Sequence, residues 1–135
     1  MSSALLLVMP PGAARDQLED LLVARGCAVT CAQAAGIGDP EGIDAVVHLP
    51  AENPFEGVAG LASGDAALAA AAAARAGARL IFCSSVLLYA DGGDAELMAN
   101  DPELDPPAAL APLADAELDV FGSRAEVMVL RLGII

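Results

Sequence analysis

Short apolar runs alternate with longer segments of helical periodicity along most of the chain. Residues 4–8 form a continuous apolar run of the kind found in strands that are buried on both faces of a parallel sheet. Similar runs follow at residues 28–31, 45–49, 80–84 and 127–132. Strands that alternate with helices are typical of a parallel sheet covered on both sides. The pattern predicts an α/β fold of three layers with about five parallel strands.

The first predicted helix covers residues 13–25. It places Leu18, Leu21 and Leu22 on one face, and Gly26 follows where a helix would end. This helix should connect the first two strands and pack its leucines against the sheet.

A run of alanines predicts the second helix. It follows Asp65, which we expect to be the N-cap, continues to Arg75 or Ala76 and ends at Gly77. Because alanine has a high helix propensity and a small side chain, this helix can lie close to the sheet. A third, short helix is predicted near residues 113–121.

The segment from residue 90 to about residue 112 interrupts the alternation. Between Arg79 and Arg124 the chain carries nine carboxylates and no basic residue, and four prolines lie among them. Such a composition is typical of an extended, solvated loop. We expect a single domain over residues 1–135, with this acidic, proline-rich loop and without a separate substrate domain.

Charge and hydrophobicity exclude several function classes. A net charge of −13 would repel nucleic acid and anionic membrane surfaces. The longest apolar run, residues 66–74, is about half the length that a membrane span needs. No basic residue precedes Arg15, so the charged start of a secretory signal is missing, and we expect a cytoplasmic protein.

The cysteines do not indicate a metal site. Cys27, Cys31 and Cys83 are odd in number and scattered, and the chain has one histidine, His48. A structural zinc ion needs four well-spaced ligands. We expect reduced cysteines in the core and no metal, and we expect His48 to be a buried histidine with its hydrogen bonds satisfied.

Two segments resemble strand motifs of a known family. Residues 44–51, DAVVHLPA, and residues 80–89, LIFCSSVLLY, resemble the NAD(P)-dependent epimerase/dehydratase branch, of extended type, of the short-chain dehydrogenase/reductase superfamily. The resemblance implies a Rossmann-like, doubly wound sheet with the strand at residues 4–8 near its middle. It covers only the nucleotide-binding part of such an enzyme, so the chain would be a truncated and degenerate relative.

The catalytic residues of that family are not present at the matching positions. Its enzymes use a Tyr-x-x-x-Lys pair, in which a cation stabilises the phenolate of the tyrosine. The matching segment has Leu113 and Glu117 in place of tyrosine and lysine, and the whole chain contains no lysine. Ser85 matches the family's serine, although serines also end strands for structural reasons. Tyr89, the only tyrosine, matches a structural position.

The family's glycine-rich loop is also eroded. Its three glycine positions match Met9, Gly12 and Arg15, and only the middle one is a glycine. Pro10 and Pro11 remove two backbone N–H donors that would face a phosphate. Arg15 could bind a phosphate instead, or it could be a solvated surface residue.

The cofactor residues that the resemblance implies are therefore few. Besides Gly12 and Arg15, they are Ala51 and Ser84 at the ends of two predicted strands. After the second strand, residues 30–33 read TCAQ and lack the family's acidic ribose ligand. We expect no bound cofactor, and NAD(P) is the one cofactor that the resemblance leaves open.

These observations favour a non-catalytic partner, scaffold or regulatory domain that forms a homodimer or a heteromeric complex. The apolar end of the chain, Ile134 and Ile135, could contribute to such an interface, and the acidic segment could attract a basic partner or only keep the protein in solution. Two alternatives stay open. The chain could be a sensor that binds NAD(P) or a nucleotide sugar, or a subunit of an oxidoreductase or epimerase that a partner chain completes.

Overall fold

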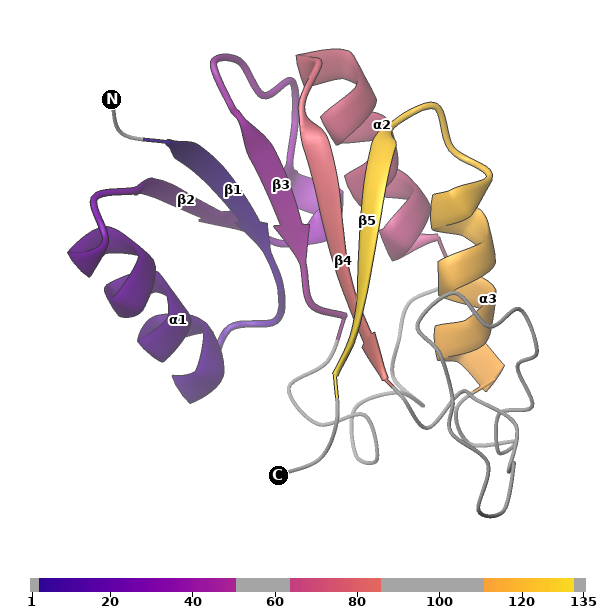
Figure 1. Cartoon of the computed structure of the whole chain (residues 1–135), viewed down its shortest axis with the longest axis horizontal. Coiled ribbons are helices and arrows are strands. Elements are labelled where there is room, and N and C mark those ends of the chain that lie inside the picture. Colours follow the sequence, from indigo (N-terminus) through magenta and orange to yellow (C-terminus); the bar gives the residue numbers. More distant parts are fainter. Residues whose placement is uncertain (1–2, 51–63, 86–110, 133–135) are drawn as a thin grey trace.

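The structure is a computed structural model, and it describes residues 3–50, 64–85 and 111–132. Strands and helices alternate along these residues (Figure 1). In chain order the elements are β1 (Ala4–Val8), α1 (Ala13–Ala24), β2 (Ala28–Ala32), the 3-10 helix η1 (Ala34–Gly36), β3 (Ala45–His48), α2 (Asp65–Ala76), β4 (Arg79–Ser85), α3 (Ala111–Phe121) and β5 (Glu126–Leu132). The five predicted strands are confirmed, and none of their ends differs by more than one residue.

The strands form one parallel sheet in the order β2-β1-β3-β4-β5. The chain runs from β1 outward to β2 and then returns past β1 to β3, so the sheet is doubly wound, as predicted. Strand β1 is an internal strand beside the central β3, in agreement with its predicted place near the middle of the sheet. Its continuous apolar run is typical of a strand that is buried on both faces.

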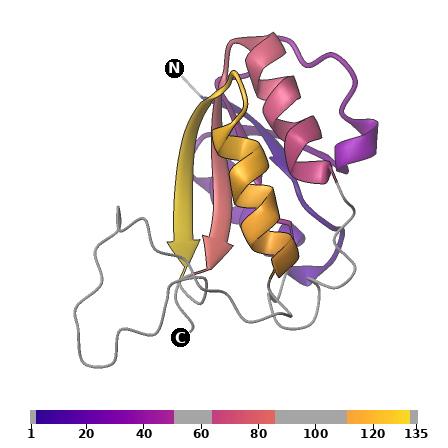
Figure 2. The same cartoon turned by 90° about the vertical axis from the view of Figure 1, so that its right-hand side faces the viewer.

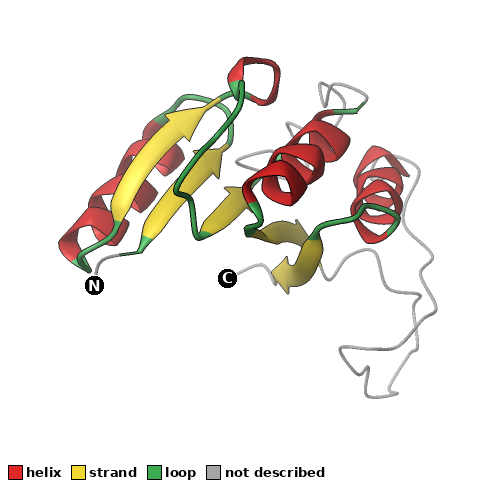
Figure 3. Cartoon of the chain, turned by 90° about the horizontal axis from the view of Figure 1, so that it is seen from above, coloured by secondary structure: helices red, strands yellow, loops and turns green. Residues whose placement is uncertain are grey.

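Helices lie on both faces of the sheet (Figure 3). Helix α1 packs beside β2 on one face, whereas α2 packs over β3 and β4, and α3 over β4 and β5, on the other. Figure 2 shows α2 and α3 side by side on their face. This arrangement confirms the predicted three-layer α/β architecture. None of the helices in the described residues is long and apolar enough to span a bilayer.

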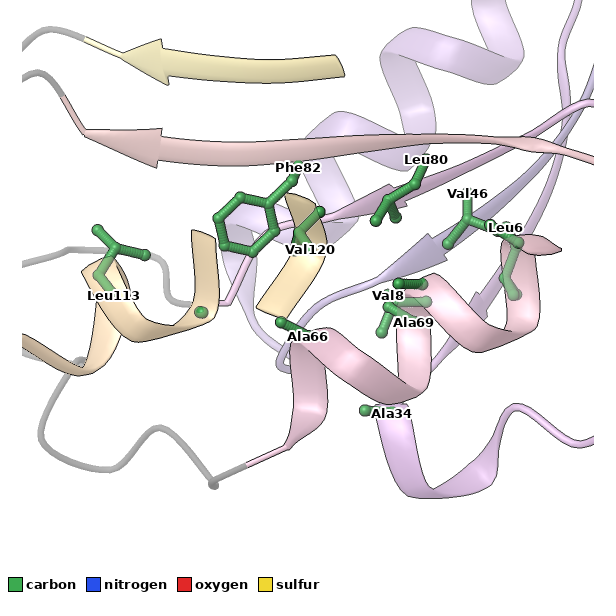
Figure 4. Packing of buried hydrophobic residues seen from close by; sticks show 13 residues of the cluster. Leu6, Val8, Ala34, Val46, Ala66, Ala69, Leu80, Phe82, Leu113 and Val120 are labelled. Carbon is green, nitrogen blue, oxygen red and sulfur yellow. The ribbon is translucent and has the colours of Figure 1, made fainter. Parts of the chain in front are cut away.

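The core lies between the sheet and α2 and α3 (Figure 4). Ala69, Ala70 and Ala73 of α2 are completely buried, because an alanine face lets the helix approach the strands closely. Alanine buries little apolar area, so larger side chains supply most of the hydrophobic stabilisation. Two of them, Phe82 of β4 and Val120 of α3, are also completely buried.

Two details of the helices differ from the sequence predictions. In α1, Leu21 is 61% exposed, whereas Leu18 and Leu22, four residues apart, are half-buried. In α2, the N-cap is Gly64, in the left-handed conformation, and Asp65 belongs to the first turn. A carboxylate there still interacts favourably with the helix dipole.

Helix α3 begins at Ala111, two residues before the predicted start. Pro112 therefore lies in the first turn, where its missing N–H would have no partner within the helix. The predicted acidic loop from residue 90 to about residue 112 otherwise lies outside the described residues, as do the apolar residues at the end of the chain.

Candidate functional site

A buried ion pair lies at the carboxyl ends of β4 and β5. Ser84 and Arg131 are register partners on these two strands, so their side chains share one face of the sheet. Glu117 of α3 packs onto that face and is 1% exposed. Its carboxylate accepts hydrogen bonds from Arg131 Nη2 at 2.7 Å and from Arg131 Nε at 3.2 Å and 3.3 Å. The Ser84 hydroxyl donates to Glu117 Oε2 at 2.5 Å.

These contacts explain how a carboxylate can lie in the core. An unpaired buried charge is strongly unfavourable, and pairing with a cation together with hydrogen bonds offsets the desolvation. The Arg131 side chain is 15% exposed, so it connects Glu117 to the edge of the buried region. Both carboxylate oxygens accept hydrogen bonds, from Ser84 and from Arg131.

Leu113 and Glu117, which the sequence resemblance matched to the family's tyrosine and lysine, lie one helical turn apart on α3. Both are buried against the sheet, and Leu113 belongs to the hydrophobic core. The leucine side chain has no group that can exchange a proton. Of these two residues, Leu113 therefore packs in the hydrophobic core, and Glu117 forms an ion pair with Arg131.

Some sequence-predicted residues are not described at the level of side chains. Ser85 is the last residue of β4, but its side chain is outside the description. Ala51 and Tyr89 lie outside the described residues altogether. Of the two serines Ser84 and Ser85, only the side chain of Ser84 is described, and its hydroxyl donates a hydrogen bond to Glu117.

The loop after β1 contains the predicted phosphate-binding positions. Met9 is 2% exposed, so its side chain fills space in the core at this turn. Gly12 is the N-cap of α1. Arg15 is half-buried and, within the described part of the chain, its Nε atom has no hydrogen-bond partner. One of the two expectations from the sequence was that Arg15 is a solvated surface residue. This expectation is wrong for its Nε atom, which is buried.

A pocket of about 120 Å³ opens where β1, β2 and β3 end. Its walls come from the loop after β1, the turn after β2, the end of β3 and the start of α2. The described residues that line it are Val8, Met9, Pro10, Pro11, Gln33, Ala34, His48, Leu49, Pro50 and Asp65. Of the cofactor residues that the resemblance implies, neither Gly12, Arg15 nor Ser84 is among them. The structure thus separates the pocket from the Glu117–Arg131 pair.

His48 contributes the buried polar group of this pocket. Its Nδ1 donates to the Val8 carbonyl oxygen at 2.9 Å, while its Nε2 is buried without a hydrogen-bond partner among the described residues. The expectation of a fully satisfied histidine is therefore wrong for one of the two ring nitrogens. Burial lowers the pKa of His48, and the Val8 carbonyl and the Asp65 carboxylate oppose that shift only in part.

The lowered pKa of His48 predicts a loss of stability in acid. The unfolded chain takes up a proton near pH 6.5, but the native state takes it up only at lower pH, so stability falls as the pH falls below 6.5. We expect this histidine to contribute to a loss of stability between about pH 7.5 and about pH 5.5. Urea unfolding at both pH values measures the loss.

The matched variant is His48→Asn, whose amide can still donate to the Val8 carbonyl but does not titrate. The variant should lose less stability than the wild type over the same interval. An equal loss in both proteins would contradict the assignment of this titration to His48.

The three cysteines are free and only half-buried, rather than deep in the core. The Cys31 thiol donates to Glu19 Oε2 at 3.3 Å, and burial, followed by that glutamate, raises its pKa. Burial raises the pKa of Cys83 to about 11. Both thiols therefore stay protonated near neutral pH. Among the described residues, no group of three potential ligands is placed to hold a metal ion.

The ion pair was not predicted from the sequence. Arginine in an apolar strand and glutamate on an apolar helix face were both visible, since Leu113, Ala116, Glu117 and Val120 have the spacing of one buried stripe. A charge in such a stripe indicates a buried partner. The partner itself, Arg131, could be identified only from the packing of α3 on β5.

Solved structures share this fold, although no protein-family model matches the chain and no curated protein matches its sequence. A dTDP-4-dehydrorhamnose reductase from Clostridium acetobutylicum superposes with a TM-score of 0.70 at 16% identity, over 94% of this chain and 52% of the reductase. MoeE5, solved with UDP-glucose and NAD, gives a TM-score of 0.63 at 20% identity, over 95% of this chain and 52% of MoeE5.

A third similar structure is a short-chain dehydrogenase/reductase superfamily protein from Agrobacterium tumefaciens with bound NAD. Its TM-score is 0.61 at 22% identity, and the match covers 94% of this chain and 48% of that protein. The chain thus spans about half the length of the solved proteins that it resembles. These likenesses show a Rossmann-like fold.

Proposed function

We propose that this chain is a non-catalytic relative of the NAD(P)-dependent epimerase/dehydratase group that acts as a partner, scaffold or regulatory domain. The observation that carries the proposal is the Glu117–Arg131 ion pair. In this pair, Glu117 occupies the position that matches the family's lysine, and Leu113 occupies the position that matches its tyrosine. A buried carboxylate there would oppose a phenolate instead of stabilising it.

The phosphate-binding loop supports the same conclusion. A dinucleotide diphosphate needs backbone N–H donors at the end of the first strand. Here Pro10 and Pro11 supply none, the Met9 side chain fills the turn, and the Asp65 carboxylate lines the pocket that follows. These residues do not fit a diphosphate, so we propose no step that depends on NAD(P).

Exposed apolar side chains support a role in protein association. Leu118 and Phe121 of α3 are 68% and 58% exposed, and Leu68 of the neighbouring α2 is 48% exposed. On β5, Met128 and Leu130 are 43% and 41% exposed. Exposed apolar groups of this size often mark interfaces. We propose a homodimer or a heteromeric complex, which light scattering combined with size-exclusion chromatography tests directly.

A nucleotide-binding sensor is the second candidate, because the similar proteins include structures solved with NAD or UDP-glucose. Calorimetric titration with NAD(H), NADP(H) and UDP-glucose separates the two candidates. The proposed partner role predicts no binding at millimolar concentrations. Binding at micromolar concentrations would replace it with the sensor.

A subunit that a partner chain completes is the third alternative. Hydride transfer by the purified chain, followed at the absorbance of the reduced nicotinamide, is the direct assay. We expect no turnover. Turnover by the chain alone would contradict a non-catalytic role, and turnover only after a partner is added would support the completed subunit.

A further inference from the structure

We propose that a second copy of this chain packs on the face of the sheet that β4 and β5 turn away from α2 and α3. We call this surface the open face, and its residues are Arg79, Ile81, Cys83, Glu126, Met128 and Leu130. The proposal rests on the partner role proposed above and makes it specific, because it names a homodimer and the surface that forms it.

The alternation of side chains along β4 and β5 creates the open face. Successive side chains of a strand point to opposite sides of the sheet. Leu80 and Phe82 of β4 belong to the core beneath α2 and α3, and Val127 and Val129 of β5 pack against that core. The residues between them therefore point to the other side. Among the described helices, none covers β4 and β5 there, because α1 packs beside β2 at the far edge of the sheet (Figure 1, Figure 2).

The middle of the open face is apolar and in contact with solvent. Ile81 and Cys83 of β4 are half-buried, and their register partners on β5, Met128 and Leu130, are exposed. A parallel sheet normally has both of its faces covered. Exposed apolar side chains on adjacent strands of such a sheet therefore indicate a surface that a further layer covers.

One end of the open face carries a balanced pair of charges. Arg79 and Glu126 are register partners, and Arg79 Nη2 lies 3.0 Å from Glu126 Oε1. The other residues of the face are uncharged, so the face is neutral although the chain has a net charge of −13. Two copies of this face can therefore meet without burying like charges. A strongly basic partner would find no excess of carboxylates here.

A two-fold axis parallel to the strands makes the open face complementary to itself. Such an axis places β5 of one copy over β4 of the other, so Glu126 of each copy lies across from Arg79 of the other. The apolar residues exchange in the same way, so Met128 lies across from Ile81. Sheets pack face to face about 10 Å apart with their strands nearly aligned, which these long side chains can span. Two-fold contacts of this kind are the commonest way in which identical chains associate.

Sedimentation equilibrium over a range of concentrations tests the proposal with the full chain. Two strands about 4.8 Å apart form a narrow surface, and stable interfaces bury about 800 Å² on each partner. We therefore expect a reversible dimer with a dissociation constant in the micromolar range. A chain that stays monomeric at high micromolar concentration overturns the proposal, whereas the wider partner role would then rest on a heteromeric complex.

A pair of lysine variants locates the interface. Met128→Lys puts a charge in the middle of the open face and should raise the dissociation constant about tenfold or more. Leu118→Lys makes the matched change at an exposed position of α3, on the opposite side of the sheet, and should dimerise as the wild type does. If only Leu118→Lys weakened the dimer, the homodimer would stand, but the open face would be the wrong surface.

An exchange of charges isolates the contact between the copies. Arg79→Glu makes the charged pair acidic and Glu126→Arg makes it basic, so each variant alone repels itself and should dimerise more weakly than the wild type. Both side chains are exposed, so both variants should fold, which circular dichroism checks.

An equal mixture of these two variants should recover the dimer, because an acidic face then meets a basic one. The like charges within each copy remain in the mixture, so recovery can arise only from contacts between copies. Failure to recover would overturn the two-fold packing, because that packing places residues 79 and 126 of the two copies opposite each other.

Discussion

Replacing Arg131 with leucine should lower the free energy of unfolding by about 3–5 kcal/mol, because it leaves the Glu117 carboxylate buried without its cation. Glu117 is 1% exposed and receives three hydrogen-bond contacts from Arg131, so water cannot easily replace them. Chemical denaturation followed by circular dichroism measures the loss. For a domain of this size, such a loss is a large part of the total stability.

The control is a second arginine–glutamate pair, between neighbouring strands. Arg79 Nη2 lies 3.0 Å from Glu126 Oε1, but the side chains are 48% and 73% exposed. Arg79→Leu should therefore lower the stability by less than about 1 kcal/mol. If the two variants lost the same stability, burial of the Glu117–Arg131 pair would not explain the effect.

Removing the whole polar group should be far less harmful than removing one partner. The triple variant Ser84→Ala, Glu117→Leu, Arg131→Leu leaves no unpaired charge and no unpaired hydroxyl at this position. Buried ion pairs that are replaced by apolar residues of similar volume often give proteins of equal or higher stability. We expect the triple variant to be more stable than Arg131→Leu alone.

Replacing Glu117 with lysine, the residue that the family has at the matching position, should destabilise the chain by more than about 3 kcal/mol. The new ammonium group would lie in the core against the Arg131 guanidinium, so two like charges would be buried together. Thermal and urea unfolding measure this loss. The position thus cannot regain the family's cation while Arg131 stays in place.

Two comparisons make this prediction specific. Asp115→Lys changes the net charge by the same amount on an exposed position of α3 and should change the stability little. The double variant Glu117→Lys, Arg131→Glu restores opposite charges and should recover part of the loss. A stable Glu117→Lys single variant would contradict the proposal that this ion pair excludes a lysine from the site.

Most of the fold could be predicted from the sequence because the local patterns that predict strands, helices and helix ends agreed with each other. Apolar runs of strand length, an alanine-rich helix and glycines at helix ends each have a physical cause that acts within a few residues. Gly26 and Gly77, for example, take positive φ values where α1 and α2 end. The order of the strands depends on contacts between distant segments, so the central position of β3 became known only from the folded chain.

The sequence by itself determined which residues of the resembled family's motifs are absent: it has no lysine, no tyrosine at residue 113, and two prolines in the loop after the first strand. Residue identity is enough for such conclusions, because a side chain that is absent cannot act. Only the tertiary structure decided what replaces those residues. Packing of α3 on β4 and β5 joins Glu117 to Ser84 and Arg131, and the reversal of the strand order brings His48, Gln33 and Asp65 to one pocket. These side chains come from separate elements, and only the packing of those elements brings them together.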